Sequence, residues 1–163
     1  RSADPPPYAI KAMLDEHEIE LVVKLSAHVP EQLHHRKQAE AVEALGITME
    51  MVPMPGDGRG TVERYVEALT LIHEAQRAGT PTWVHCAAGT HRTGGVIASY
   101  RLLFDHWAPG PIYEEMAAHG LTPQVNADLF EYLNANLPKI AAGLVERGVL
   151  PRLPERIPKL GPG

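Results

Sequence analysis

The sequence contains a single cysteine, Cys86, among its 163 residues. One thiol excludes an internal disulfide and a Cys-x-x-Cys metal pair. There are nine histidines, but their spacing to carboxylates and to the thiol is not that of a structural metal site. We therefore expect neither a metal site nor a bound cofactor.

Long apolar runs and an excess of positive charge are also missing. No run approaches the roughly 20 apolar residues of a membrane-spanning helix, and the first residues are polar and proline-rich, unlike a signal peptide. The formal net charge is −5, whereas non-specific nucleic-acid binding requires a basic surface. These absences argue against membrane and nucleic-acid partners, and a free thiol favours the reducing cytoplasm. The oligomeric state stays open.

Apolar patterning predicts the fold class. With 44% hydrophobic and 21% charged residues, the chain is long enough to bury the core of one domain. Short apolar runs over residues 21–25, 47–54 and 82–85 alternate with segments of helical spacing. This order predicts an α/β fold, a mainly parallel sheet of about four to five strands with helices on both faces. We expect one domain over residues 1–150, followed by a proline-rich extended tail over 151–163.

Several residues predict where helices begin and end. Thr61 is a suitable N-cap, and Gly46 and Gly79 are placed to end helices. Pro123 is expected to begin a helix, and a separate last helix is expected to end near Gly148.

The cysteine lies in the stretch Val-His-Cys-Ala-Ala-Gly-Thr-His-Arg-Thr-Gly-Gly, residues 84–95. It follows the third expected strand, at the sheet edge where ligands bind in parallel folds. The helix that begins near Arg92 directs free N–H groups and a positive dipole end to this place, which favours a thiolate. Gly89 lets the backbone curl so that N–H groups point inward, and Arg92 adds a planar fork for two oxygens. The stretch predicts a tetrahedral-oxyanion site with a nucleophile at its base.

Phosphoryl transfer to sulfur also needs an acid for the leaving oxygen, and Asp57 is the candidate. It lies in the turn after the second strand, at the same sheet edge, although aspartate before glycine is also an ordinary turn residue. Thr93 would donate its hydroxyl to the departing thiolate, and His85 would orient the loop through hydrogen bonds. Arg59 is either a phosphate contact or a solvated loop residue. His91 either lines the pocket rim or forms hydrogen bonds outside it.

These residues carry a family resemblance. The run His-Cys-Ala-Ala-Gly-Thr-His-Arg-Thr-Gly resembles the signature loop of cysteine-dependent protein tyrosine and dual-specificity phosphatases. Residues 56–61, Gly-Asp-Gly-Arg-Gly-Thr, resemble the family's general-acid loop. The opening Arg-Ser-Ala-Asp-Pro-Pro-Pro and the later Glu-Leu-Val-Val-Lys-Leu-Ser are similar to the start of compact atypical dual-specificity phosphatases of bacteria, plants and fungi. The similarity extends from Arg1 to about His119.

The resemblance implies a phosphotyrosine phosphatase-like fold and hydrolysis of phosphate monoesters through a cysteinyl-phosphate intermediate. It implies that Cys86 is the nucleophile, Arg92 the phosphate-binding arginine and Asp57 the general acid, with Thr93 assisting release of the thiolate. The substrate-binding loop would then comprise Ala87, Ala88, Gly89, Thr90, His91 and Arg92.

The loop departs from one branch of the family in its charge. The plant and fungal branch, associated with highly phosphorylated inositol compounds, usually has two basic residues after the cysteine and a lysine before the histidine. Here these positions hold Ala87, Ala88 and Thr90. We therefore expect a phosphorylated protein as substrate, with a small phosphorylated metabolite, including inositol polyphosphates and pyrophosphates, as the alternative.

Three other activities use a similar loop. A sulfurtransferase loop resembles this one less in its arginine spacing and in the preceding histidine. A small arsenate reductase would need further cysteines for its redox relay. A phosphate-binding pseudo-phosphatase is the non-enzymatic alternative, and the intact set of Cys86, Arg92 and Thr93 argues against it.

Overall fold

The computed structural model describes residues 3–162 and contains one parallel sheet. Its three strands are β1 (Leu21–Lys24), β2 (Thr48–Met51) and β3 (Thr82–His85), in the order β2-β1-β3. Each connection between them contains a helix, as parallel neighbours require. The expected α/β class is confirmed. The sheet is narrower than the four to five strands expected, because every element after β3 in the described part of the chain is a helix.

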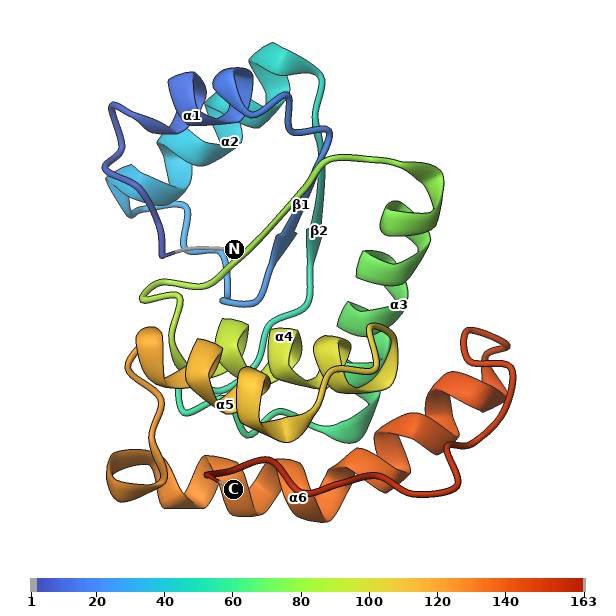
Figure 1. Ribbon diagram of the computed structural model, residues 1–163. Helices are drawn as coiled ribbons and strands as arrows, with labels where there is room; N and C mark the ends of the chain where they lie inside the picture. The colour runs from blue at the N-terminus through green and yellow to red at the C-terminus, as the bar shows by residue number, and fades with distance from the viewer. Residues whose placement is uncertain (1–2, 163) are drawn as a thin grey trace.

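Six helices occur within residues 3–162. They are α1 (Ile10–Glu16), α2 (Leu33–Leu45), α3 (Val62–Ala78), α4 (His91–Leu103), α5 (Pro109–Ala118) and α6 (Pro123–Glu146). Figure 1 shows α1 and α2 on one side of the strands, with α3 and α4 on the other and α5 and α6 beyond α4. None of the helices in the described residues is both long and apolar enough to cross a membrane.

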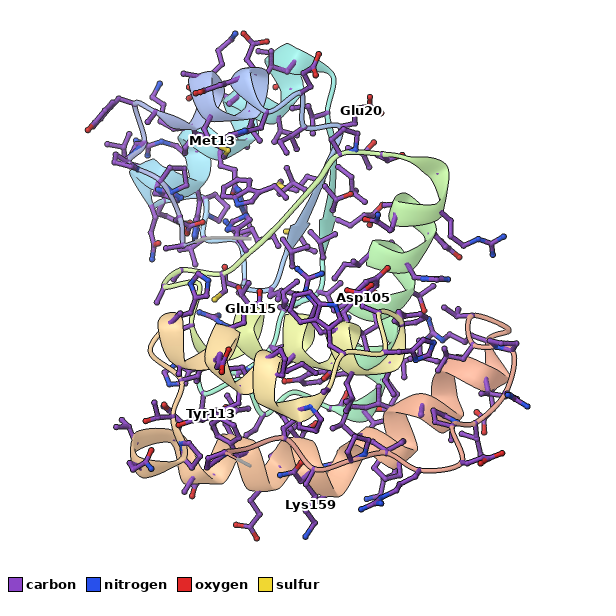
Figure 2. The ribbon with its side chains drawn as sticks, viewed as in Figure 1. Met13, Glu20, Asp105, Tyr113, Glu115 and Lys159 are labelled. Atoms are coloured by element: carbon purple, nitrogen blue, oxygen red, sulfur yellow. The ribbon has the colours of Figure 1, made fainter. Side chains whose placement is uncertain are left out.

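Successive side chains of the strands are buried on opposite faces of the sheet. Val22 and Trp83 are buried with apolar side chains of α1 and α2, where Met13 also packs (Figure 2). Val23 and Val84 are buried on the opposite face, in the larger cluster that includes α3, α4 and α6. A strand directs successive side chains to opposite faces, so both faces of this sheet are covered, as is usual for parallel sheets.

The second strand leads to the turn that contains Asp57. Regular strand structure ends at Met51, earlier than the expected Met54. The N–H groups of Val52 and Met54 still donate to the carbonyls of Lys24 and Leu25, at 2.9 and 3.1 Å. The intervening proline has no N–H group to donate, so the pairing is interrupted but continues toward the sheet edge.

Most of the expected helix ends are confirmed. The Thr61 hydroxyl accepts a hydrogen bond from Arg64 N at 3.3 Å, and Gly46 and Gly79 end helices with φ of 66° and 73°. The prediction of two separate C-terminal helices was wrong. They form the single element α6, which continues through Pro138 and has its non-helical residue at Asn126.

The segment after residue 150 runs back along α6 (Figure 1). It has no helix or strand up to residue 162. Leu160 is only 3% exposed, and its backbone N–H and carbonyl both bond to the Asn134 side chain, at 2.8 and 3.0 Å. This packing covers part of the apolar face of α6.

Candidate active site

The loop between β3 and α4 contains the cysteine. Cys86 follows the last residue of β3 and is 2% exposed. Gly89 has a φ of 68°, a conformation that glycine adopts more readily than other residues. Thr90 precedes α4 but makes no side-chain capping hydrogen bond. The Thr90 side chain therefore leaves the first N–H groups of α4 available, and free N–H groups at a helix start can bind an anion.

Two polar side-chain atoms at the end of this loop lack hydrogen-bond partners among the described residues. Arg92 Nε and Thr93 Oγ1 are buried, and neither forms a hydrogen bond within residues 3–162. A buried polar group without a partner costs about 1–3 kcal/mol, so such groups indicate a site that a ligand completes. Sequence analysis had assigned both residues to the oxyanion site, Arg92 as a donor to two oxygens and Thr93 as a hydroxyl donor to the thiolate.

The turn that contains Asp57 packs against the first residue of α4. Gly58 has a φ of 81°, and a Cβ atom there would lie 3.0 Å from the His91 carbonyl carbon. Tyr65 Oη donates to the Gly58 carbonyl at 2.7 Å, and the Tyr132 hydroxyl donates to the Gly60 carbonyl. Helices α3 and α6 thus fix this turn beside the start of α4.

A cavity of about 310 Å³ lies between this turn and the start of α6. Asp57 and His91 both line it, together with Arg59 and the first turn of α6, whereas Cys86 is not among its lining residues. The described structure therefore brings two of the predicted site residues, Asp57 and His91, together at one cavity.

The Asp57 carboxylate is held by Arg59. Asp57 Oδ1 accepts from Arg59 N at 2.9 Å, and Oδ2 accepts from Arg59 Nε at 2.8 Å. The backbone N–H of Arg59, and then its guanidinium, keep the pKa of the Asp57 carboxyl below its ordinary value. Arg59 also lies 3.6 Å from the Asp128 carboxylate of α6. From the sequence, Arg59 was interpreted as a phosphate contact or as a solvated loop residue. Its ion pair with Asp57 was not predicted.

His91 lies at the cavity and also bonds outside the loop. Its Nε2 accepts a hydrogen bond from Asn126 Nδ2 at 2.9 Å, and the Asn126 carbonyl oxygen accepts from Thr122 N at 3.2 Å. Asn126 is the non-helical residue of α6, with φ −126° and ψ 35°. The hydrogen bond to Asn126 is the outside contact that the sequence offered as one alternative, and a place for His91 at the rim of the phosphate pocket stays a prediction.

His85 is completely buried beneath the loop. Its Nδ1 donates to the Asp4 carboxylate, its Nε2 lies 2.7 Å from Gln38 Nε2, and its ring stacks on Trp83 at 3.8 Å. Sequence reasoning missed Asp4 and Gln38, which come from distant segments. The one local signal was Lys24, a charge in an otherwise apolar strand; its Nζ donates to Gln38 Oε1 at 2.6 Å.

No cluster of three or more histidine, cysteine or carboxylate side chains suited to a metal ion occurs in the described residues.

Residues 8–105 match the profile of a family described as a polymorphic toxin system DSP-PTPase phosphatase. The chain belongs to this family. It is a cysteine-dependent phosphomonoester hydrolase of the dual-specificity type, as the resemblance of the loop had indicated. A comparison with curated proteins gave no significant match.

Solved structures of phosphatases share the fold. The core catalytic domain of the PP-IP phosphatase SIW14 from S. cerevisiae, in complex with citrate, is 21% identical with a TM-score of 0.71, covering 93% of this chain and 88% of that one. TpbA from P. aeruginosa is 22% identical with a TM-score of 0.68, covering 89% and 84%. A Cys-to-Ser variant of TpbA was solved in complex with pTyr. The phosphotyrosine phosphatase-like fold is thereby confirmed.

Proposed function

We propose that this phosphatase acts on phosphotyrosine and related monoesters of proteins, with residues 1–150 as its catalytic domain. The observation that carries this proposal is the charge of the cavity beside the Cys86 loop. Two carboxylates, Asp57 and Asp128, line the cavity there with one arginine, Arg59. The Asp128 carboxylate, together with Asp57 whenever it is ionised, repels a ligand with many phosphates, whereas one phosphate on a neutral aryl group enters more easily.

The loop itself supports the same choice. Ala87 and Ala88 are exposed and uncharged, and Thr90 is uncharged as well. Arg92 is then the only formal cation in the loop from residue 86 to residue 92, apart from His91 when it is protonated. One guanidinium and the start of one helix match a single phosphate group.

In the proposed first step, the Cys86 thiolate attacks phosphorus, forming an S–P bond while the P–O bond to the alcohol breaks. Asp57 gives its proton to the leaving oxygen. Arg92 and the loop N–H groups stabilise the charge on the remaining phosphate oxygens.

In the second step, water attacks the phosphocysteine and its proton goes to Asp57. The S–P bond breaks, inorganic phosphate forms, and the Thr93 hydroxyl donates to the released thiolate. No electron transfer or further reactant is involved.

A panel of four substrates tests the proposal. We expect kcat/KM for an aryl phosphate and a phosphotyrosine peptide to exceed that for a phosphoserine peptide and inositol hexakisphosphate by about tenfold or more, which corresponds to about 1.4 kcal/mol. A kcat/KM for inositol hexakisphosphate above those for all three other substrates would establish the inositol phosphatase alternative. Phosphate binding without turnover of any substrate would instead identify a pseudo-phosphatase.

Replacing the acid gives a result that depends on the leaving group. With Asp57→Asn, we expect kcat for a phosphoserine peptide to fall about 10²- to 10³-fold, and that for para-nitrophenyl phosphate to fall much less. The alkoxide needs a proton as it departs, whereas nitrophenolate does not. Asp15→Asn, an exposed acid on α1, is the control. Equal losses on both substrates would remove Asp57 from this role.

Replacing Arg59 shifts the pH profile. Arg59→Gln keeps the backbone N–H bond to Asp57 but removes the guanidinium, so the pKa of Asp57 rises. A general acid must be protonated, and a higher pKa keeps it protonated to higher pH. We therefore expect the alkaline limb of kcat/KM for a phosphotyrosine peptide to move to higher pH. Arg64→Gln on α3 is the matched control, and an unmoved limb would contradict the assignment.

A further inference from the structure

The N-terminal segment contacts the loop on both sides of Cys86. The backbone N–H of Asp4 donates to the Ala87 carbonyl at 3.2 Å. The Asp4 carboxylate accepts the hydrogen bond from His85 Nδ1. One residue therefore fixes both neighbours of the cysteine, and Figure 1 shows this end of the chain beside the loop that follows β3. Asp4 lies ahead of the residues matched by the family profile.

The contacts beyond His85 define the direction of its hydrogen bonds. Lys24 and Gln38 are both completely buried. A lysine ammonium only donates, so Gln38 must present its carbonyl oxygen to Lys24 Nζ at 2.6 Å. The Gln38 amide nitrogen is left to face His85 Nε2 at 2.7 Å. This nitrogen also only donates, so His85 Nε2 must accept and the ring proton must be on Nδ1, facing Asp4.

The charges around His85 agree with a neutral ring. Burial lowers the pKa of the imidazole, and the Lys24 charge acts in the same direction, although Asp4 opposes both. Burial raises the pKa of Asp4, but the hydrogen bond from His85 and the positive charge of Lys24 act in the opposite direction, and the pKa of Asp4 lies below its ordinary value. Asp4 Oδ2 also lies 3.3 Å from His34 Nε2. The series of side-chain contacts thus begins at the Lys24 ammonium, passes through the neutral Gln38 and His85, and ends at the Asp4 carboxylate.

We propose that Asp4 is a positioning residue of the phosphatase reaction, which holds His85 in the Nδ1–H tautomer and fixes the loop on either side of Cys86. It acts through His85 and Ala87 and does not touch the phosphate. This proposal rests on Cys86 being the nucleophile, as proposed above. A thiolate displaced by a fraction of an ångström would attack phosphorus from a poorer direction, while phosphate would still bind to Arg92.

Kinetics separate positioning from binding. With Asp4→Ala, we expect kcat for para-nitrophenyl phosphate to fall about 10- to 100-fold and KM to change less than about threefold. Asp4→Asn keeps an oxygen that accepts from His85, so it should restore kcat to within about threefold of wild type. Asp15→Ala on α1 is the control. Unchanged kcat in Asp4→Ala, or a loss confined to KM, would overturn the proposal.

The tautomer is measured without any substrate. Long-range proton–nitrogen correlation spectra of the wild type should show His85 protonated on Nδ1 and bare on Nε2, with His85→Gln used to assign its signals. A proton on Nε2, or a cationic ring at neutral pH, would overturn the proposal even if the enzyme were active. If this tautomer is found but no substrate is hydrolysed, the failure belongs to the proposed function.

A second variant serves if Asp4→Ala does not fold. Gln38→Glu has nearly the same shape, but it only accepts hydrogen bonds, so it requires a proton on His85 Nε2. With Asp4 still accepting from Nδ1, we expect the His85 ring to carry a proton on both nitrogens and kcat to fall, whereas Gln76→Glu, an exposed site on α3, should leave both the ring protonation and kcat unchanged. A folded Gln38→Glu enzyme with the wild-type tautomer and wild-type kcat would overturn the proposal.

Discussion

Cys86→Ser is expected to lower turnover of an aryl phosphate by about 10⁴-fold or more, the scale on which loss of a nucleophile acts in hydrolases. A serine hydroxyl is not ionised at neutral pH, and no neighbouring general base is positioned by the proposed mechanism to activate it. The measurement is phosphate release at substrate saturation. Retention of more than about one part in a hundred of the activity would show that another group attacks phosphorus.

Binding provides the control for this variant. Arg92 and the N–H groups at the start of α4 are unchanged in Cys86→Ser, so inorganic phosphate should bind as tightly as to the wild type in calorimetry. The single cysteine allows a complementary test, since alkylation by iodoacetamide can modify only one thiol. Phosphate should protect the wild type from both alkylation and inactivation. Alkylation that leaves activity intact would exclude Cys86 as the nucleophile.

The parts of the fold that depend on local sequence were predictable. Thr61, Gly46 and Gly79 set helix ends through their own backbone conformations and side chains, and β3 ends at His85 as its apolar run indicates. The expected break before the last helix is absent, although Pro138 lies in this stretch and a proline usually interrupts a helix. Here α6 continues through it, with apolar side chains on both sides buried in the core.

The contacts that support the site could not be found in the same way. Asp4, Gln38 and His85 come from three distant segments, and nothing in their spacing indicates that they meet. Asn126 reaches His91 because α6 departs from helical geometry at that residue. Signature residues can be recognised from a short stretch, whereas the side chains that hold them depend on tertiary packing.

Arg92→Lys should be the most damaging conservative change in the loop. We expect kcat/KM for para-nitrophenyl phosphate to fall about 10³-fold, mainly through kcat. Lysine keeps the positive charge but loses the planar fork that holds two phosphate oxygens. Arg92 Nε, buried and without a partner among the described residues, is one of the donors that the ammonium cannot replace.

The two variants should also differ in phosphate binding. Cys86→Ser removes the attacking atom and keeps the anion site, whereas Arg92→Lys keeps the thiol and weakens the site for phosphate. Arg64→Lys, at a half-buried ion pair with Glu67 on α3, controls for the substitution itself and should retain wild-type kcat/KM. If Arg92→Lys bound phosphate and turned over substrate like the wild type, a positive charge at this position would be enough for binding and catalysis. The two-oxygen fork would then have no part in stabilising the transition state.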